Sequence, residues 1–228
     1  MIWKKLLEKQ KKQTHICKNC FNDINFQSFH KLFSLDYNLC DRCLFKFDPI
    51  FKFFKIDGVN ALAIYKYDDQ IKDKIYLYKG CEDYELKDIF VEPFKLELEV
   101  IFDGYKIVPI PSYFEDDQKR GFNHVVEIFK CLDLEMYKCL IKTENIKQKE
   151  LNYEDRQKIG DILKFDEKFK VKNKKILIVD DVITTGASMK AAIKIMKKYG
   201  ARKVKVLCLA KREIDETNTF STKIKERL

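Results

Sequence analysis

The sequence contains no uninterrupted apolar run that approaches the roughly 18 residues needed to cross a membrane. Its first segment, Met1 to Lys12, also lacks the unbroken apolar core of a secretory signal, because lysines interrupt it. We therefore expect a cytoplasmic protein with no membrane insertion. Because the cytoplasm keeps thiols reduced, the eight cysteines are not expected to form structural disulfides.

Acidic residues are in the minority. The chain has 36 Asp and Glu against 45 Lys and Arg, which gives a formal net charge of +9. Such an excess is compatible with a nucleic-acid partner or a polyanionic substrate, and also with a proteome that is simply rich in lysine. With 228 residues, 46% of them hydrophobic, the chain can bury a substantial core and fits one medium domain plus a small appendage.

An apolar run ends in two adjacent carboxylates near the C-terminus. Ile176 to Val179 suit a central parallel strand, which is apolar on both faces because helices cover both. Asp180 and Asp181 then lie at the carboxyl edge of the sheet, where open α/β sheets bind their ligands. A helical pattern that ends near Gly200 and a second apolar run, Val204 to Ala210, complete a βαβ unit. The sequence therefore predicts an α/β fold with a parallel sheet flanked by helices.

The loop between the first of these strands and the helix predicts a sugar-phosphate site. Its backbone N–H groups and hydroxyls can hold a phosphate at the start of the helix, and Gly186 lets the backbone approach an anion closely. Asp180 and Asp181 would repel a bare phosphate, but they can accept hydrogen bonds from a ribose diol and can hold Mg²⁺. The alternative is an ordinary acidic turn followed by a Thr/Ser helix cap.

The segment from Ile176 to Ser188 resembles the phosphoribosyl-pyrophosphate (PRPP) signature of type I phosphoribosyltransferases. This resemblance implies a type I phosphoribosyltransferase-like sheet, with Asp180 and Asp181 as catalytic residues that contact ribose and Mg²⁺. It implies PRPP contacts from Val182, Ile183, Thr184, Thr185, Gly186, Ala187 and Ser188, with Pro111 at the end of a second strand.

Four of the cysteines are spaced like metal ligands. The pairs Cys17-x-x-Cys20 and Cys40-x-x-Cys43 have the spacing of a four-thiolate zinc site built from two knuckles. A structural Zn²⁺ ion would stabilise a segment too short to form its own core. His15 and His30 are candidate substitute ligands, although surface histidines near such a site are the simpler reading. Cys81, Cys131, Cys139 and Cys208 lie in apolar surroundings and are expected in the core.

The sequence divides into two parts, a zinc-finger segment with a Phe-rich connector over residues 1–54 and a phosphoribosyltransferase-like domain over residues 55–228. The connector contains Phe45, Phe47, Phe51, Phe53 and Phe54 between lysines. These rings can pack the finger onto the main domain or stack on the bases of a single strand. In the main domain we expect a first strand at Ala61 to Tyr65, a helix at Ile71 to Tyr78, a strand at Ile107 to Pro111 and a helix at Val125 to Leu132.

The whole pattern resembles the ComF family of phosphoribosyltransferase-like competence proteins. Beyond the finger and the PRPP signature, the segments that carry this resemblance are Tyr65-Lys66-Tyr67, Lys79-Gly80, Val108-Pro-Ile-Pro111, Arg120-Gly-Phe-Asn123, and Gln148 with Arg156. The resemblance implies a protein of natural transformation that acts on incoming single-stranded DNA beside a competence DNA helicase. It places Gln148, Lys149 and Arg156 in a flap over the leaving pyrophosphate, and gives Arg120 and Asn123 no role.

These observations support two classes of function. In the first, the protein is an enzyme that displaces pyrophosphate from PRPP with an unknown acceptor, for which no general base is evident. In the second, it is a DNA-binding adaptor for which PRPP is a regulatory ligand. A combination, with DNA uptake as the role and PRPP as the bound metabolite, fits the finger, the charge and the signature together. A nucleobase phosphoribosyltransferase of nucleotide salvage is the remaining alternative, but it would not need a finger.

Overall fold

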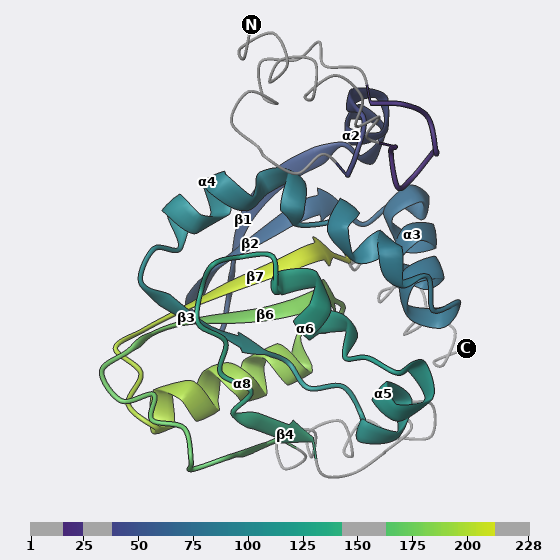
Figure 1. Cartoon of the computed structure of the whole chain (residues 1–228). Helices are drawn as coiled ribbons and strands as arrows, with labels where there is room; N and C mark the ends of the chain where they lie inside the picture. The colour runs from purple at the N-terminus through teal and green to yellow at the C-terminus, as the bar shows by residue number, and fades with distance from the viewer. Residues whose placement is uncertain (1–15, 25–37, 143–162, 213–228) are drawn as a thin grey trace, which may run out of the picture.

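A five-stranded sheet forms the centre of the protein (Figure 1). The computed structural model describes residues 16–24, 38–142 and 163–212. The strand order is β1-β2-β7-β6-β3; β1 is antiparallel to β2 and every other pairing in this sheet is parallel. Its strands are β1 (Pro49–Ile56), β2 (Val59–Lys66), β3 (Tyr105–Pro109), β6 (Lys175–Ile183) and β7 (Lys203–Lys211), and β4 (Leu140–Lys142) pairs separately with β5 (Leu163–Phe165).

Helices cover both faces of this sheet, which confirms the predicted α/β architecture (Figure 1). The helix α8 packs on one face, and α3, α4 and α6 pack on the other. The helices are α2 (Asp41–Phe47), α3 (Asp69–Gly80), α4 (Lys95–Ile101), α5 (Phe114–Arg120), α6 (His124–Phe129) and α8 (Ala187–Lys198), with the 3₁₀ helices η2 (Tyr84–Ile89) and η3 (Glu92–Phe94).

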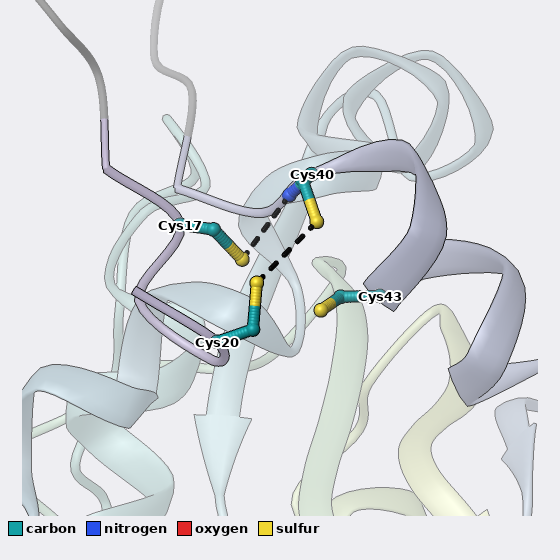
Figure 2. Close-up of side chains that lie close together, drawn as sticks. All are labelled: Cys17, Cys20, Cys40 and Cys43. Atoms are coloured by element: carbon teal, nitrogen blue, oxygen red, sulfur yellow. Dashed lines mark hydrogen bonds between the residues drawn. The ribbon is translucent and has the colours of Figure 1, made fainter. Parts of the chain in front are cut away.

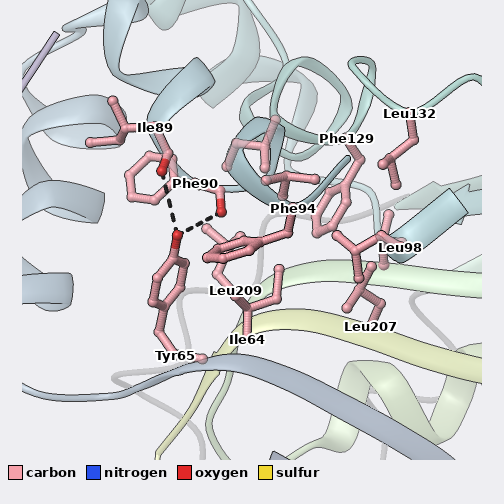
Figure 3. Close-up of a cluster of buried hydrophobic side chains, with 14 of the residues drawn as sticks. Ile64, Tyr65, Ile89, Phe90, Phe94, Leu98, Phe129, Leu132, Leu207 and Leu209 are labelled. Atoms are coloured by element: carbon pink, nitrogen blue, oxygen red, sulfur yellow. Dashed lines mark hydrogen bonds between the residues drawn. The ribbon is translucent and has the colours of Figure 1, made fainter. Parts of the chain in front are cut away.

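The central strand β6 is as apolar as the sequence predicts. Its residues Ile176 to Val179 are fully buried, because each face of the strand contributes to one of two hydrophobic clusters. Figure 3 shows the cluster on the α3 and α4 side, where the hydroxyl of Tyr65 donates to the carbonyl of Phe90 at 2.8 Å. The predicted βαβ unit is confirmed as β6, α8 and β7, and Gly200 follows α8 with a φ of +80°.

The cysteine-bearing segment packs directly onto the main domain. Cys17, Cys43 and Phe47 belong to the same buried cluster as the α3 side of the sheet. Lys18, which lies between the cysteines of the first pair, forms an ion pair with Glu85 of η2 at 2.8 Å. These contacts make the finger part of the larger core.

Several boundaries differ from the predicted ones. Ala61 to Tyr65 lies in the second strand, β2, because most of the Phe-rich connector forms an earlier strand, β1, which pairs with it. The predicted boundary after residue 54 therefore falls inside β1. The second predicted strand ends at Pro109, and the helix predicted to reach Leu132 ends at Phe129. Among the connector rings, Phe47 is buried and Phe51 packs against Phe94 at 4.9 Å, whereas Phe45 and Phe53 are exposed.

The structure also tests the membrane prediction in part. Within the described residues, no helix has both the length and the apolar character that a membrane span requires.

Candidate functional site: an acidic pair beside a glycine turn

The two aspartates of the signature lie at the end of β6. Beside them, β3 runs parallel to β6, with Pro109 opposite Val179, and the N–H of Ile110 still bonds to the Val179 carbonyl at 2.9 Å. Pro111 follows at once, so the chain leaves the sheet next to the acidic pair. The structure therefore brings the predicted pyrophosphate segment and the predicted ribose segment to one edge.

The turn from Thr184 to Ser188 is open to ligands. Thr184 and Thr185 are exposed, and Gly186 is the buried cap residue of α8 with a φ of +73°. A Cβ on Gly186 would meet Cδ1 of Ile56 at 2.7 Å, so both the backbone conformation and the space require glycine. Because this cap residue has no side chain to occupy them, the N–H groups of the first turn of α8 are available to an anion.

Asp181 is the buried member of the acidic pair. Its Oδ2 accepts a hydrogen bond from Lys79 Nζ at 2.9 Å and lies 3.3 Å from Nε2 of His124, while its Oδ1 accepts from the N–H of Val182. Burial alone would raise the pKa of Asp181, but the hydrogen bond from His124 and the charge of Lys79 outweigh burial and hold the pKa below its usual range. Asp181 is therefore ionised at neutral pH.

Asp180 has a different environment. It is partly exposed, and its Oδ1 accepts from the N–H of Asp181 at 2.9 Å. Burial of its carboxyl group and the negative charge of Asp181 raise its pKa well above the usual value. A cation beside Asp180 would offset this repulsion, and a ribose hydroxyl would stabilise the carboxylate by donating a hydrogen bond to it.

A second lysine, Lys142, interacts electrostatically with Asp180. Lys142, at the end of β4, has its ammonium group 4.0 Å from the ring centroid of Tyr113. Burial lowers the pKa of Lys142, and the charge of Asp180 opposes this effect. Lys79 and Lys142 thus supply positive charge near the acidic pair.

The Arg-Gly-Phe-Asn segment forms a network behind Asp181. The guanidinium of Arg120 donates to the Lys79 carbonyl at 2.9 Å, to Asp117 at 3.2 Å, and reaches Nδ1 of His124 at 3.1 Å. Asn123 caps α6 by accepting from the N–H of Val126, and donates to Asp117 at 2.7 Å. Burial lowers the pKa of His124 despite its contact with Asp181, so the imidazole is neutral at pH 7.

The structure places Asp180, Asp181 and residues 182–188 along the end of β6 and the start of α8. Gln148, Lys149 and Arg156, predicted to form the flap, lie outside the described residues. Sequence reasoning missed the contributions of Lys79, His124 and Lys142 to the site. Lys79 belongs to one of the segments that carried the family resemblance and His124 adjoins another, but no spacing in the sequence links either residue to the acidic pair.

The four predicted zinc ligands converge, as Figure 2 shows. Their sulfur atoms all lie within 4.8 Å of one another, and those of Cys20 and Cys40 are 3.7 Å apart. Four thiolates about 2.3 Å from a tetrahedral Zn²⁺ ion would be about 3.8 Å apart, so the donor set fits zinc. His15 and His30 lie outside the described residues.

The thiols in this cluster differ in acidity. Burial raises the pKa of Cys43 to about 12. Although burial also acts on Cys20, hydrogen bonds with the backbone of Asn22 and with neighbouring thiols lower its pKa to about 6. A bound cation would favour the thiolate at every position.

The four remaining cysteines were predicted to lie in the core. Cys139 and Cys208 are buried as predicted, and Cys131 is partly buried. The prediction for Cys81 was wrong, because its side chain is exposed at the end of α3.

A basic pocket lies at the same edge of the sheet as the acidic pair. It has a volume of about 470 Å³, and its cationic lining residues are Lys52, Lys66, Lys211 and Arg212. Lys66 and Lys211 are partners on the adjacent strands β2 and β7, and the N–H of Arg212 bonds to the carbonyl of Ile183. The pocket therefore adjoins the strand that carries the acidic pair, and no Asp or Glu is among the described residues that line it.

Comparison with known proteins identifies relatives of the chain. A family model described as "Phosphoribosyl transferase domain" matches residues 141–222. The "Competence protein ComFC" of Streptococcus pneumoniae is 32% identical over 155 residues, which cover 68% of this chain and 69% of that protein. The "Competence protein ComFC" of Bacillus subtilis is 26% identical over 140 residues, 60% of this chain and 58% of that protein.

Among solved structures, a hypoxanthine phosphoribosyltransferase from Staphylococcus aureus aligns with a TM-score of 0.34 and 12% identity, over 62% of this chain and 65% of that one. So distant a likeness adds nothing to the sequence relationships.

Proposed function

This chain belongs to the ComFC family of competence proteins, and we propose that it binds PRPP with Mg²⁺ and handles incoming single-stranded DNA in the cytoplasm during natural transformation. The observation that carries the PRPP part is the placement of Asp180 and Asp181 at the carboxyl edge, shortly before the open turn that leads into α8. That edge is the ligand side of a parallel sheet.

Each part of PRPP has a counterpart in the site. The 5-phosphate binds the N–H groups and hydroxyls of residues 184–188, where the start of α8 favours an anion. The ribose hydroxyls donate to Asp180, which is less buried than Asp181 as a residue, and the pyrophosphate lies toward Pro111 with Lys142 nearby. The oxygen donors of the acidic pair suit Mg²⁺, which would neutralise part of the charge of the pyrophosphate.

The DNA-binding part of the proposal rests on the basic pocket. Lys66, Lys211 and Arg212 can neutralise the phosphates of a single strand at the edge that adjoins the PRPP turn. Phe45 and Phe53 are 83% and 72% exposed, and such rings can stack on bases. Zn²⁺ in the cysteine cluster fixes the knuckles on the core, and a competence DNA helicase is the proposed source of the strand.

Calorimetric titration of PRPP, with and without Mg²⁺ and with and without an oligothymidylate, tests this function. The protein is expected to bind PRPP in the presence of Mg²⁺, and the double variant Asp180→Asn/Asp181→Asn is expected to lose that binding while still binding the oligonucleotide. Binding of neither ligand by the wild-type protein would refute the proposal.

An assay of pyrophosphate release separates a transferase from a protein that only binds PRPP. Release that requires the oligonucleotide would identify DNA as the acceptor. Release that requires a free nucleobase would instead assign the protein to nucleotide salvage. Mg²⁺-dependent PRPP binding without release under any of these conditions would indicate a regulatory ligand.

A further inference from the structure

Arg120, His124 and Asp181 form a continuous chain of contacts. Arg120 Nη1 lies 3.1 Å from Nδ1 of His124, and Nε2 of His124 lies 3.3 Å from Oδ2 of Asp181. The side chains of all three residues are at most 10% exposed. The contact between an imidazole and the acidic pair is therefore shielded from water.

The chemistry of arginine decides where the imidazole carries its proton. A guanidinium has only N–H donors and stays charged, so Nδ1 of His124 must accept the hydrogen bond from Arg120. A neutral imidazole has one N–H, and that proton must then be on Nε2, which faces Asp181. Arg120 thus converts His124 into a hydrogen-bond donor directed at the carboxylate.

The rest of the Arg-Gly-Phe-Asn segment holds Arg120 in this position. Asp117 accepts from Arg120 and from Asn123, while the guanidinium also donates to the carbonyl of Lys79. Gly121 ends α5 with a φ of +79°, which allows the chain to turn back. Asn123 then caps α6, whose first residue is His124. Each of these residues therefore acts on the Arg120–His124 contact.

We propose that Arg120 and His124 are positioning residues of the sugar-phosphate site: Arg120 fixes the His124 proton on Nε2, and His124 with Lys79 holds the Asp181 carboxylate in place. With three donors on its two oxygens, Asp181 anchors the end of β6 and leaves Asp180 as the carboxylate that meets the ligand. This inference rests on the proposed PRPP binding and gives the Arg-Gly-Phe-Asn segment its role.

Two measurements on the full-length, zinc-loaded protein test this proposal. The first is the ¹⁵N spectrum of the imidazole rings, in which the His124 signals are those absent from His124→Gln. The wild type is expected to show Nε2 protonated and Nδ1 unprotonated, and Arg120→Met to show a mixture of tautomers. A proton on Nδ1 in the wild type would overturn the proposal.

The second measurement is the affinity for PRPP with Mg²⁺. Arg120→Met and His124→Leu are expected to weaken binding by about 10–100-fold, the effect typical of losing a residue that orients a ligand-binding side chain. His124→Gln keeps an N–H donor toward Asp181 and is expected to retain most of the affinity. Arg202→Met, which removes an exposed arginine at the opposite edge of the sheet, is the control.

The outcomes separate this proposal from the proposed function. If the wild type binds PRPP and Arg120→Met binds it equally well, with an amide spectrum that shows an intact fold, the positioning role is wrong. If the wild type binds no PRPP, the proposed function fails, and the imidazole spectrum alone then decides whether Arg120 sets the tautomer.

Discussion

The ammonium nitrogen of Lys79 lies 2.9 Å from Oδ2 of Asp181, although 102 positions separate the two residues in the sequence. Lys79 lies near the end of α3 and Asp181 near the end of β6, so this ion pair joins the helix layer to the ligand edge of the sheet. Asp181 is buried while Lys79 is 40% exposed. Removal of the lysine would leave a buried carboxylate short of one partner.

We therefore expect Lys79→Met to destabilise the fold and to weaken PRPP binding. The expected destabilisation is about 1–2 kcal/mol, less than for a fully buried pair because solvent screens Lys79. Urea denaturation measures this change, with Lys72→Met on the exposed face of α3 as the control. Equal unfolding midpoints for the two variants would contradict the prediction.

The turn from Thr184 to Ser188, proposed to bind the phosphate of PRPP, leads to a separate prediction at Gly186. Alanine there would adopt a positive φ, at a cost of roughly 1–2 kcal/mol, and its Cβ would also collide with Ile56. Gly58→Ala is the matched control, because Gly58 has a φ of +74° but nothing within 4 Å of the added atom. Both variants should lose stability, with the larger decrease for Gly186→Ala.

Only Gly186→Ala should also lose PRPP affinity, by roughly tenfold, the equivalent of one hydrogen bond to a charged phosphate. Isothermal titration of both variants checks this expectation. Equal affinities in the two variants would show that the turn does not hold the phosphate.

The cysteine cluster predicts that metal removal destabilises more than the knuckles, because Cys17 and Cys43 belong to the main core. Chelation of zinc is expected to lower the melting temperature by roughly 5–10 °C. Cys43→Ser should have the same effect, whereas Cys81→Ser should have none because Cys81 is exposed. An unchanged melting temperature after chelation, with zinc removal verified by elemental analysis, would show that zinc does not stabilise the fold.

Stability should depend on pH through His124. The folded protein holds the pKa of this imidazole below its ordinary 6.5, so the unfolded chain takes up the proton first. The stability that this residue contributes is therefore present above about pH 6.5 and lost as the pH falls through the folded-state value. Asp181, whose pKa is also lowered, acts in the same direction only below its ordinary 3.8.

Urea denaturation at pH 7.5 and pH 5.5 measures this effect. His124→Gln cannot take up the proton, so its stability should fall less between these two pH values than that of the wild type. An equal loss of stability between these two pH values in both proteins would mean that His124 is not the group responsible for the pH dependence.

The basic pocket predicts a salt effect on DNA binding. Replacing Lys66 and Lys211 with glutamine should weaken binding of an oligothymidylate and reduce the slope of log K against log salt by about 0.7 for each phosphate that is no longer neutralised. Lys194→Gln/Lys198→Gln removes the same charge from the exposed surface of α8 and should change the slope little. Fluorescence anisotropy over a series of salt concentrations compares the two double variants. Identical slopes of log K against log salt in both variants would mean that the DNA does not bind at the basic pocket.

Local sequence patterns predicted the part of the site that is contiguous in the chain. The four apolar residues before Asp180, the glycine turn and the spacing of α8 placed the acidic pair at the ligand edge, because each depends on neighbours within a few positions. The paired CxxC motifs likewise predicted the convergence of four thiols. The first pattern reflects backbone geometry that a short segment specifies by itself, and the second reflects the ligand spacing that one shared metal ion requires.

Long-range contacts could not be predicted in the same way. Lys79 and His124 reach Asp181 only because α3 and α6 pack on one face of the sheet, and a lysine near a helix end is otherwise ordinary. The strand β1 was mistaken for a connector because its apolar residues do not alternate regularly, in keeping with the shift in register between Pro49 and Lys52.

The central claim, that PRPP binds at the carboxyl edge beside Asp180, is tested most directly by titrating PRPP with Mg²⁺ into ¹⁵N-labelled protein and following assigned amide resonances. Binding at this edge should produce saturable shifts at Thr184 to Ser188 and at Asp180, with none at Cys17 or Cys40. Saturating PRPP that shifts only resonances distant from this turn, or none at all, would contradict the claim.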